Sequence, residues 1–208
     1  MAKKVVITIA RQYGSGGREI GERVANLLGI PFYDKEIIKE AASKGNLNEG
    51  VAKSIDESAA NSLLYTLAMG SNVIGPSAHF GYKMPINDKL FILQSDVIKT
   101  YAKNGSCVII GRCSDYVLKD ELGVLRIFIY GDLDHRKQRI MERHPEIKSS
   151  QLIDVINKTD KRRASYYNFY TGNKWGKYDN YDLAINSSTL GISGTAEIIV
   201  DYAKKLMD

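Results

Sequence analysis

Short runs of apolar residues alternate along the chain with segments in which apolar residues recur every three or four positions. The runs at 5–10, Cys107–Ile110 and Val124–Tyr130 are apolar almost throughout, which is typical of strands covered on both faces. Shorter runs at 31–33 and 183–185 indicate two further strands. The pattern therefore predicts a sheet of mostly buried strands.

Helical spacing of apolar residues follows nearly every one of these runs. A glycine-rich segment after the first run leads into a predicted helix over 18–28, and residues 35–43 predict a second helix with Asp34 as its N-cap. The same spacing predicts helices at 55–69, 88–103, 132–143, 149–170 and 193–207. Residues 70–85 are rich in Gly, Pro, Ser and Asn, and they predict a mobile loop.

Strands that alternate with helices indicate right-handed βαβ units and a parallel sheet. The predicted fold class is therefore α/β, with helices on both faces of the sheet. The 208 residues of the chain fit one domain, since neither a repeat nor a linker rich in Pro or Ser divides them. Ligands of such folds bind at the carboxyl ends of the strands.

Composition excludes several classes of protein. With 44% hydrophobic and 25% charged residues, the chain is not a disordered one. No apolar run approaches the roughly 18–20 residues that span a bilayer, so we expect no membrane partner. Two cysteines are too few for a disulfide framework or a four-ligand zinc site, and we expect a reduced cytoplasmic protein. The net charge of +5 mildly favours anionic ligands.

A glycine-rich loop directly after the first strand is the main candidate for chemistry. Gly14, Ser15, Gly16 and Gly17 precede Arg18, at the start of the predicted helix. Glycines let several backbone N–H groups point inward, and a helix N-terminus adds partial positive charge, so the segment suits a phosphate. A turn without a ligand is the simpler interpretation, but three glycines and a basic residue exceed what a turn requires.

Two phosphate-binding motifs match this loop incompletely. The dinucleotide fingerprint G-x-G-x-x-G is met by Gly14 and Gly16 but has Glu19 at the third glycine. Asp34 does lie where a ribose-binding acid is expected. The P-loop pattern G-x-x-x-x-G-K-[ST] lacks its first glycine here and has Arg18 at the lysine. The loop alone does not decide between the two motifs.

The order of motifs along nearly the whole chain resembles that of the nucleoside monophosphate kinases, most closely the cytidylate kinase-like branch of bacterial proteins. The resemblance rests on ITIARQYGSGGREIGERVANLLGIPFYD at 7–34, VIIGR at 108–112, an arginine-rich helix, Asp-x-x-Arg at 160–163 and YDLAINSS at 181–188. It implies a three-layer αβα P-loop NTPase-like fold with a divergent phosphate-binding loop. It also implies ATP-dependent phosphoryl transfer to a nucleoside monophosphate, with CMP or dCMP as the leading acceptor.

The resemblance also implies how the single domain is divided. The core would comprise about 1–34, 105–135 and 180–208, with a helical monophosphate-binding insertion at about 35–104 and a lid at about 140–175. ATP phosphates would bind at Gly14, Ser15, Gly16, Gly17 and Arg18, the acceptor at Asp34, Arg112 and Arg136, and catalysis would depend on Arg18, Arg139, Asp160 and Arg163. In this scheme Arg139 and Arg163 neutralise the transition state, because phosphoryl transfer depends on positioning and charge neutralisation.

Three departures from the family pattern concern the phosphates and the metal. Arg18 keeps the lysine's charge, but its planar fork differs from a compact ammonium. Glu19 and Ile20 supply no hydroxyl for Mg²⁺, and Ile110 stands where the family carries an acid. Asp115 could compensate for that acid. These departures place the Mg²⁺ requirement in doubt, assign no metal ligand, and leave a second hypothesis: a non-catalytic protein that binds nucleotide or phosphate.

Basic and aromatic residues in the last third of the chain allow a third hypothesis. A basic cluster at 158–163 precedes an aromatic run at 166–175, a combination found in single-strand nucleic-acid binders. The packing face of a helix is the commoner origin of such a run, so nucleic acid is the least favoured partner. We expect a small-molecule nucleotide as the partner, and a homo-oligomer is compatible with the sequence.

Overall fold

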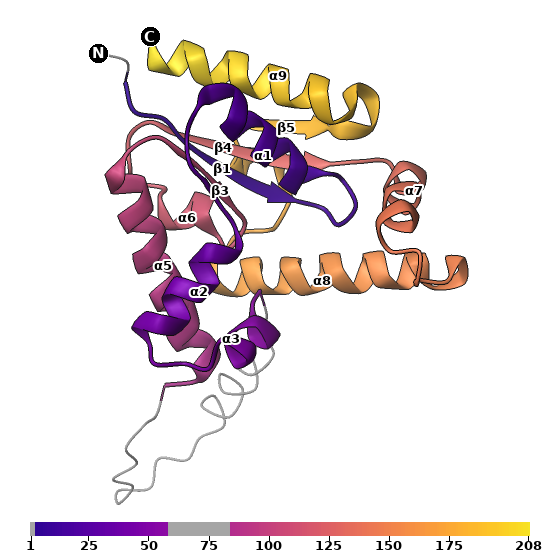
Figure 1. Ribbon diagram of the computed structural model, residues 1–208, viewed down its shortest axis with the longest axis horizontal. Helices are drawn as coiled ribbons and strands as arrows, with labels where there is room; N and C mark the ends of the chain where they lie inside the picture. Colours follow the sequence, from indigo (N-terminus) through magenta and orange to yellow (C-terminus); the bar gives the residue numbers. More distant parts are fainter. Residues whose placement is uncertain (1–2, 58–83) are drawn as a thin grey trace, which may run out of the picture.

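The computed structural model describes residues 3–57 and 84–208. Its sheet has five strands in the order β2-β3-β1-β4-β5, and every neighbouring pair is parallel. The strands are β1 Val6–Arg11, β2 Phe32–Tyr33, β3 Cys107–Ile110, β4 Val124–Tyr130 and β5 Leu183–Asn186. The predicted α/β fold with a parallel sheet is confirmed, and Figure 1 shows the sheet between layers of helices.

Helices cover both faces of the sheet, as the continuous apolar strands require. They are α1 Gly17–Leu28, α2 Lys35–Lys44, α3 Glu49–Ile55, α5 Ile86–Asn104, α6 Ser114–Val117, α7 Leu133–Arg143, α8 Leu152–Thr171 and α9 Ser187–Met207, with short 3₁₀ helices at Ser149–Gln151 and Tyr178–Asn180. On one face α1 packs beside α9, and on the other α2 packs beside α5 (Figure 1). None of the described helices is long and apolar enough to cross a lipid bilayer.

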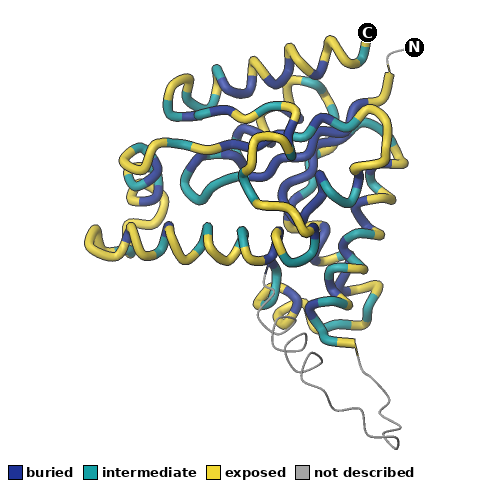
Figure 2. Tube along the Cα trace, turned by 180° about the vertical axis from the view of Figure 1, so that it is seen from behind, coloured by how far each residue is buried: buried dark blue, intermediate teal, exposed yellow. Residues whose placement is uncertain are grey.

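The first strand shows why its residues must be apolar on both sides. Ile7 and Ile9 belong to the core formed with α1 and α9, whereas Val6 belongs to the core formed with α2 and α5. Successive side chains of a strand point to opposite faces, so a strand between two helical layers has no polar face. Figure 2 shows these central strands as the most deeply buried part of the chain.

Most predicted elements are confirmed within one or two residues of their observed ends, and the final helix is the clearest exception. It begins at Ser187 instead of 193, and Gly191 interrupts it with φ 64° and ψ −171°. The Asn186 side chain accepts a hydrogen bond from Ser188 N–H and so caps the earlier start. Most of the predicted helix at 55–69 and of the loop at 70–85 lies outside the described residues.

Helices α7 and α8 pair beyond the carboxyl ends of β1 and β4 (Figure 1). Ile140, Leu152 and Ile156 form an apolar cluster between them, and Tyr13 of the glycine-rich loop packs against it. The far part of α8 is anchored by Tyr166 and other aromatic residues, packed against Cys113. Because Tyr166 and Tyr167 are buried and the other rings of the run are partly buried, the aromatic run is a packing face, as the commoner interpretation predicted.

Candidate phosphate-binding site

The loop between β1 and α1 is pinned by its own serine. Ser15 is fully buried, and its hydroxyl donates to the carbonyls of Gln12 at 2.9 Å and Ile129 at 3.2 Å. Ser187 Oγ in turn donates to the Ser15 carbonyl at 2.7 Å. Gly14 and Gly16 have φ of 81° and 77°, a region that favours glycine. The loop backbone is therefore held in one shape, with its hydroxyl directed into the protein.

Five positions around the start of α1 offer free backbone donors. Within the described part of the chain, no acceptor is bonded to the N–H groups of Gly14, Gly16, Gly17, Arg18 and Glu19. The first N–H groups of a helix have no partner inside the helix, and they carry the positive end of its dipole. A loop with this backbone can bind a phosphate through N–H groups alone.

Side chains from α7 and α8 fasten the loop from outside. Asp160 Oδ1 accepts from the N–H of Tyr13 at 2.7 Å, and Arg136 Nε donates to the Tyr13 carbonyl at 2.7 Å. Arg136 and Asp160 also form an ion pair with each other. The approach is close, since a Cβ on Gly14 would lie 2.8 Å from the Arg136 carbonyl oxygen. Both side chains thus position the loop.

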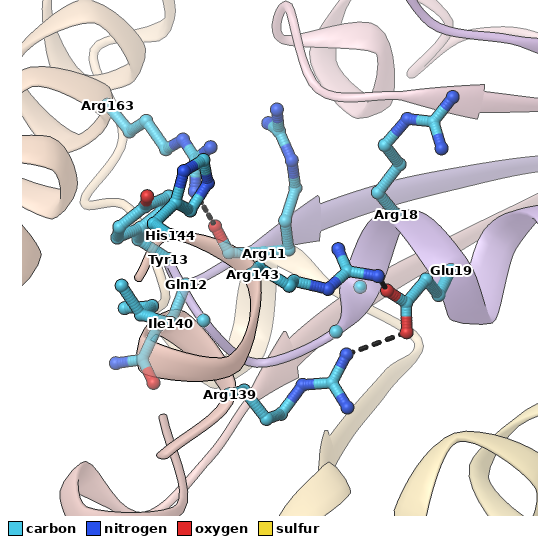
Figure 3. A pocket seen from close by; sticks show the side chains of 13 residues that line it. Arg11, Gln12, Tyr13, Arg18, Glu19, Arg139, Ile140, Arg143, His144 and Arg163 are labelled. Atoms are coloured by element: carbon cyan, nitrogen blue, oxygen red, sulfur yellow. Dashed lines mark hydrogen bonds and ion pairs between the residues drawn. The ribbon is translucent and has the colours of Figure 1, made fainter. Parts of the chain in front are cut away.

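A cavity of about 190 Å³ opens beside the loop, and we call it the arginine cavity. Its lining includes residues of the loop, the start of α1, α7 and α8 (Figure 3). Five guanidinium groups line it, those of Arg11, Arg18, Arg139, Arg143 and Arg163. Glu19 supplies the carboxylate of this lining. Such an excess of cations suits a polyanionic ligand.

At the loop end of the cavity, two arginines of α7 meet this carboxylate. Arg139 Nη2 lies 2.7 Å from Glu19 Oε2, and Arg143 pairs with the other carboxylate oxygen. Figure 3 shows both guanidinium groups converging on Glu19. We call these three residues the loop cluster. The carboxylate therefore holds the α7 arginines next to the N–H groups at the start of α1.

A second group of two arginines and one glutamate lies at the carboxyl end of β1. Arg11 Nη1 is 2.7 Å from Glu57 Oε1, and Arg163 Nε is 3.2 Å from Glu57 Oε2. Arg163 also donates to the Arg11 carbonyl at 3.1 Å. We call these residues the buried cluster. Burial alone would raise the pKa of Glu57, but the charges of Arg11 and Arg163 outweigh it and hold that pKa far below its usual range.

The predicted acceptor residues Asp34 and Arg112 form a network next to the buried cluster. Arg112 is almost fully buried and lies 3.1 Å from both Asp34 Oδ1 and Asp56 Oδ2. It belongs to a left-handed turn after β3, because Gly111, Arg112 and Cys113 all have positive φ. Burial alone would lower the pKa of Arg112, but the charges of the neighbouring carboxylates raise it. Asp34 thus pairs with arginine and does not cap α2 through its side chain, contrary to expectation.

The sequence predictions for this site are brought together only in part. Arg139 and Arg163 line the arginine cavity beside the glycines. Arg18 borders the same cavity, but its Nε lies 2.9 Å from Asp34 Oδ2 and its side chain is 48% exposed. Arg136 contacts the loop at Tyr13 and has no contact with Asp34 or Arg112 among its described hydrogen bonds.

Three members of the site were missed from the sequence: Arg11, Glu57 and Arg143. Arg11 carried a usable signal, because it is a charged residue at the carboxyl end of an otherwise apolar strand and directly before the glycine-rich loop. Glu57 carried none, since it follows a short helix and reaches the site through tertiary packing. Arg143 was seen as part of an arginine-rich helical face without a separate role.

The described residues do not fit a preformed magnesium site. No group of three or more His, Cys, Asp or Glu side chains suitable for a metal occurs in the described ranges. Glu19 and Asp160, the carboxylates next to the loop, are both paired with arginines, and the Ser15 hydroxyl is bonded to backbone. Asp115 accepts from the Tyr167 hydroxyl at 2.7 Å and lines a neighbouring small cavity, outside the lining of the arginine cavity.

Comparison with known proteins agrees with this fold. A family model described as the cytidylate kinase-like family matches residues 6–189. No curated protein sequence matches the chain.

Solved structures share the fold. An uncharacterized protein from Eubacterium ventriosum ATCC 27560 is 26% identical, with a TM-score of 0.71 over 96% of this chain and 98% of that one. A shikimate kinase from Bacteroides thetaiotaomicron is 14% identical, with a TM-score of 0.53 and the same coverage, a likeness of fold alone.

Proposed function

Because the chain belongs to the cytidylate kinase-like family, we propose that it transfers the γ-phosphoryl group of ATP to a nucleoside monophosphate, with CMP or dCMP as the acceptor. The observation that carries this proposal is the arginine cavity, which five arginines line beside a loop with free N–H donors. Phosphoryl transfer needs little covalent help from the protein and much positioning and neutralisation of charge.

The proposed roles follow the positions of the side chains. The free N–H groups of Gly14, Gly16, Gly17 and Arg18 would hold the donor phosphates, and Arg139 and Arg163 would neutralise the transferred group. Arg136 and Asp160 would keep the loop in shape, since both bond to Tyr13.

On the acceptor side, Asp34 and Arg112 would shape the site. In the structure the Arg112 guanidinium already pairs with the carboxylates of Asp34 and Asp56, each at 3.1 Å. An acceptor phosphate would therefore have to compete with carboxylates for this guanidinium, whereas Arg18 is half exposed beside Asp34 and is reached more easily.

ATP fits the free N–H groups of the loop, whereas the carboxylates of the site do not form a preformed metal site. Mg²⁺ usually keeps several waters and binds protein through one or two carboxylates plus substrate phosphates. The requirement for the metal is tested by measuring ADP release in Mg²⁺ and in EDTA in parallel.

The proposal is tested by ADP release from ATP with a panel of nucleoside monophosphates. We expect release that depends on the acceptor, highest with CMP or dCMP, and a loss of about a hundredfold or more in kcat for Arg163→Ala, because an arginine that neutralises transferred phosphate contributes strongly. Arg162→Ala is the matched control, since Arg162 is the exposed neighbour on α8 and lies outside the cavity lining. Equal activity of the two variants would contradict the assigned role.

A non-catalytic nucleotide-binding protein is the second candidate. The observation in its favour is the Glu19 carboxylate, which stands where P-loop proteins carry the hydroxyl residue that binds Mg²⁺. It predicts thermal stabilisation by ATP or ADP, unchanged by EDTA, with no ADP formed from ATP in the presence of any acceptor. Acceptor-dependent ADP release rules this candidate out.

A further inference from the structure

Arg18 stands at the lysine position of the P-loop pattern, but its guanidinium does not point toward the loop. Arg18 donates to Asp34 at 2.9 Å and to Glu22 at 3.0 Å, and its guanidinium lies over the Phe32 ring at 5.4 Å. In Figure 3 its side chain points away from the loop cluster. The phosphate nearest the acceptor therefore needs a cation from elsewhere.

Arg11 is placed to supply that cation. It is the last residue of β1, it lines the arginine cavity, and its side chain is 14% exposed. Its course is defined by two glycines: a Cβ on Gly17 would lie 2.5 Å from Arg11 Cβ, and a Cβ on Gly111 would lie 2.4 Å from Arg11 Nη1. The side chain thus runs from the loop, past the start of α1, to the end of β3.

The path of Arg11 joins the two halves of the proposed reaction. Gly17 belongs to the phosphate loop, whereas Gly111 directly precedes Arg112, the predicted acceptor residue. The Arg11 side chain spans this interval, and its guanidinium lies at the Gly111 end, next to the predicted acceptor residue. The transferred group occupies that same interval in an in-line phosphoryl transfer.

The charges around Arg11 favour a further anion. Arg11 and Arg163 share the single carboxylate of Glu57, and Arg163 also lies close enough to donate to the Arg11 carbonyl. Burial and the nearby Arg11 charge lower the pKa of Arg163 to about 10, so it stays protonated at neutral pH. Among the described residues, these two guanidinium groups pair with one carboxylate, and a phosphoryl group would neutralise the remaining positive charge.

We propose that Arg11 contacts the γ-phosphoryl group of ATP and takes the part that the loop residue Arg18 does not play, with Glu57 as the positioning residue that holds its guanidinium. This rests on the proposed function. In the step, an acceptor phosphate oxygen forms a bond to the γ-phosphorus while the bond from that phosphorus to the β–γ bridging oxygen breaks. The bonding electron pair stays on ADP, and Arg11 neither gives nor takes a proton.

The test compares two ligands that differ in the γ-phosphate. Calorimetry measures the affinity of the wild type and of Arg11→Ala for ADP and for the ATP analogue with an imido β–γ bridge. We expect Arg11→Ala to lower the affinity for the analogue about ten- to hundredfold, the range for a lost charge-assisted contact. The affinity for ADP should stay within about twofold of the wild-type value. Arg11→Lys should recover part of the difference, because it restores charge without the planar fork.

Arg126→Ala is the matched control. Arg126 pairs with Asp182 at 2.7 Å, so the variant also removes an arginine–carboxylate pair, but one outside the lining of the arginine cavity. If Arg11→Ala does not fold, the pair Arg11→Gln with Glu57→Gln removes one charge of each sign and must show the same selective loss. An equal loss of affinity for ADP and for the analogue, or no loss of affinity for either, overturns the role of Arg11.

The outcome separates this inference from the proposed function. A selective loss of the imido analogue in a protein that releases no ADP with any acceptor would uphold the Arg11 contact and reject the kinase. Acceptor-dependent ADP release with unchanged kcat and KM for ATP in Arg11→Ala would uphold the kinase and reject the contact. A wild type that binds neither nucleotide overturns both.

Discussion

The loop cluster and the buried cluster have the same composition, one glutamate between two arginines, but they differ in exposure to solvent. In the buried cluster the side chains of Arg11, Glu57 and Arg163 are 14%, 9% and 13% exposed. In the loop cluster Arg139 is 17% exposed, Glu19 26% and Arg143 54%. Water reaches Arg143 in the loop cluster and is mostly excluded from all three side chains of the buried cluster.

The difference in exposure determines which glutamate is a permanent partner of its arginines and which can be replaced by a phosphate. An exposed ion pair contributes about 0–1 kcal/mol, because water and salt screen it. Removing one partner from a buried pair costs about 3–5 kcal/mol, because the other charge stays buried without compensation. Glu57 therefore belongs to the folded framework, whereas Glu19 can release its arginines to a phosphate at low cost.

The largest expected effect is that of Glu57→Gln on stability. The substitution leaves Arg11 and Arg163 buried with no carboxylate between them, and we expect the free energy of unfolding to fall by about 3–5 kcal/mol. Urea denaturation followed by circular dichroism measures it. Glu19→Gln is the matched control and should cost less than about 1 kcal/mol. Equal losses would remove the distinction between the clusters.

Acid should abolish the stabilisation by Glu57. Its pKa is lowered in the folded protein, so the unfolded chain binds the proton first, at about pH 4.3. The contribution is fully present above that pH and is lost progressively as the pH falls toward the folded value. The gap in unfolding free energy between the wild type and Glu57→Gln should therefore narrow from pH 6 to pH 3. A gap that widens in this range would mean that the pKa of Glu57 is raised.

The fold could be predicted from the sequence because its strands are apolar without interruption. Val124–Tyr130 and Cys107–Ile110 were located to the residue, since a short apolar run between polar segments has few other structures available. The phosphate loop was found because glycine spacing is a local signal. The start of α9 was missed because Gly191 interrupts helical geometry within the element.

The site was predicted less completely because its charges are paired through tertiary contacts. Glu57 meets Arg11 and Arg163 across 46 and 106 residues, and no spacing along the chain encodes such a meeting. Asp34 appeared to be a helix cap because its position before α2 has that local pattern, but Arg18 and Arg112 occupy its carboxylate. Local patterns predict elements and loops, while the partner of a buried charge depends on the whole fold.

An intermediate effect is expected for Gly17→Ala, which disturbs the buried cluster from the loop side. Gly17 has no positive φ, so the cost is steric: the new Cβ would lie 2.5 Å from Arg11 Cβ. We expect a loss of about 1–3 kcal/mol in unfolding free energy and weaker binding of ATP. Gly29→Ala is the control, because that site is open but has φ 64°, so it should cost about 1 kcal/mol without changing ATP affinity. Unchanged ATP affinity in Gly17→Ala would mean that the position of Arg11 does not matter for phosphate binding.

The smallest effect concerns the loop cluster, where Glu19→Gln should strengthen anion binding. Without the carboxylate, Arg139 and Arg143 are free for a phosphate, and one negative charge leaves the start of α1. We expect affinity for inorganic tripolyphosphate to rise about two- to fivefold in about 0.05 M salt and the gain to disappear in about 0.5 M salt, because exposed charges are screened. Glu142→Gln makes the same charge change on α7, where Glu142 bonds only to Gln138 among the described residues, and should change affinity little. A gain that is equal in both variants would reflect net charge alone, and a loss in Glu19→Gln would mean that the carboxylate positions the α7 arginines for the phosphate and does not compete with it.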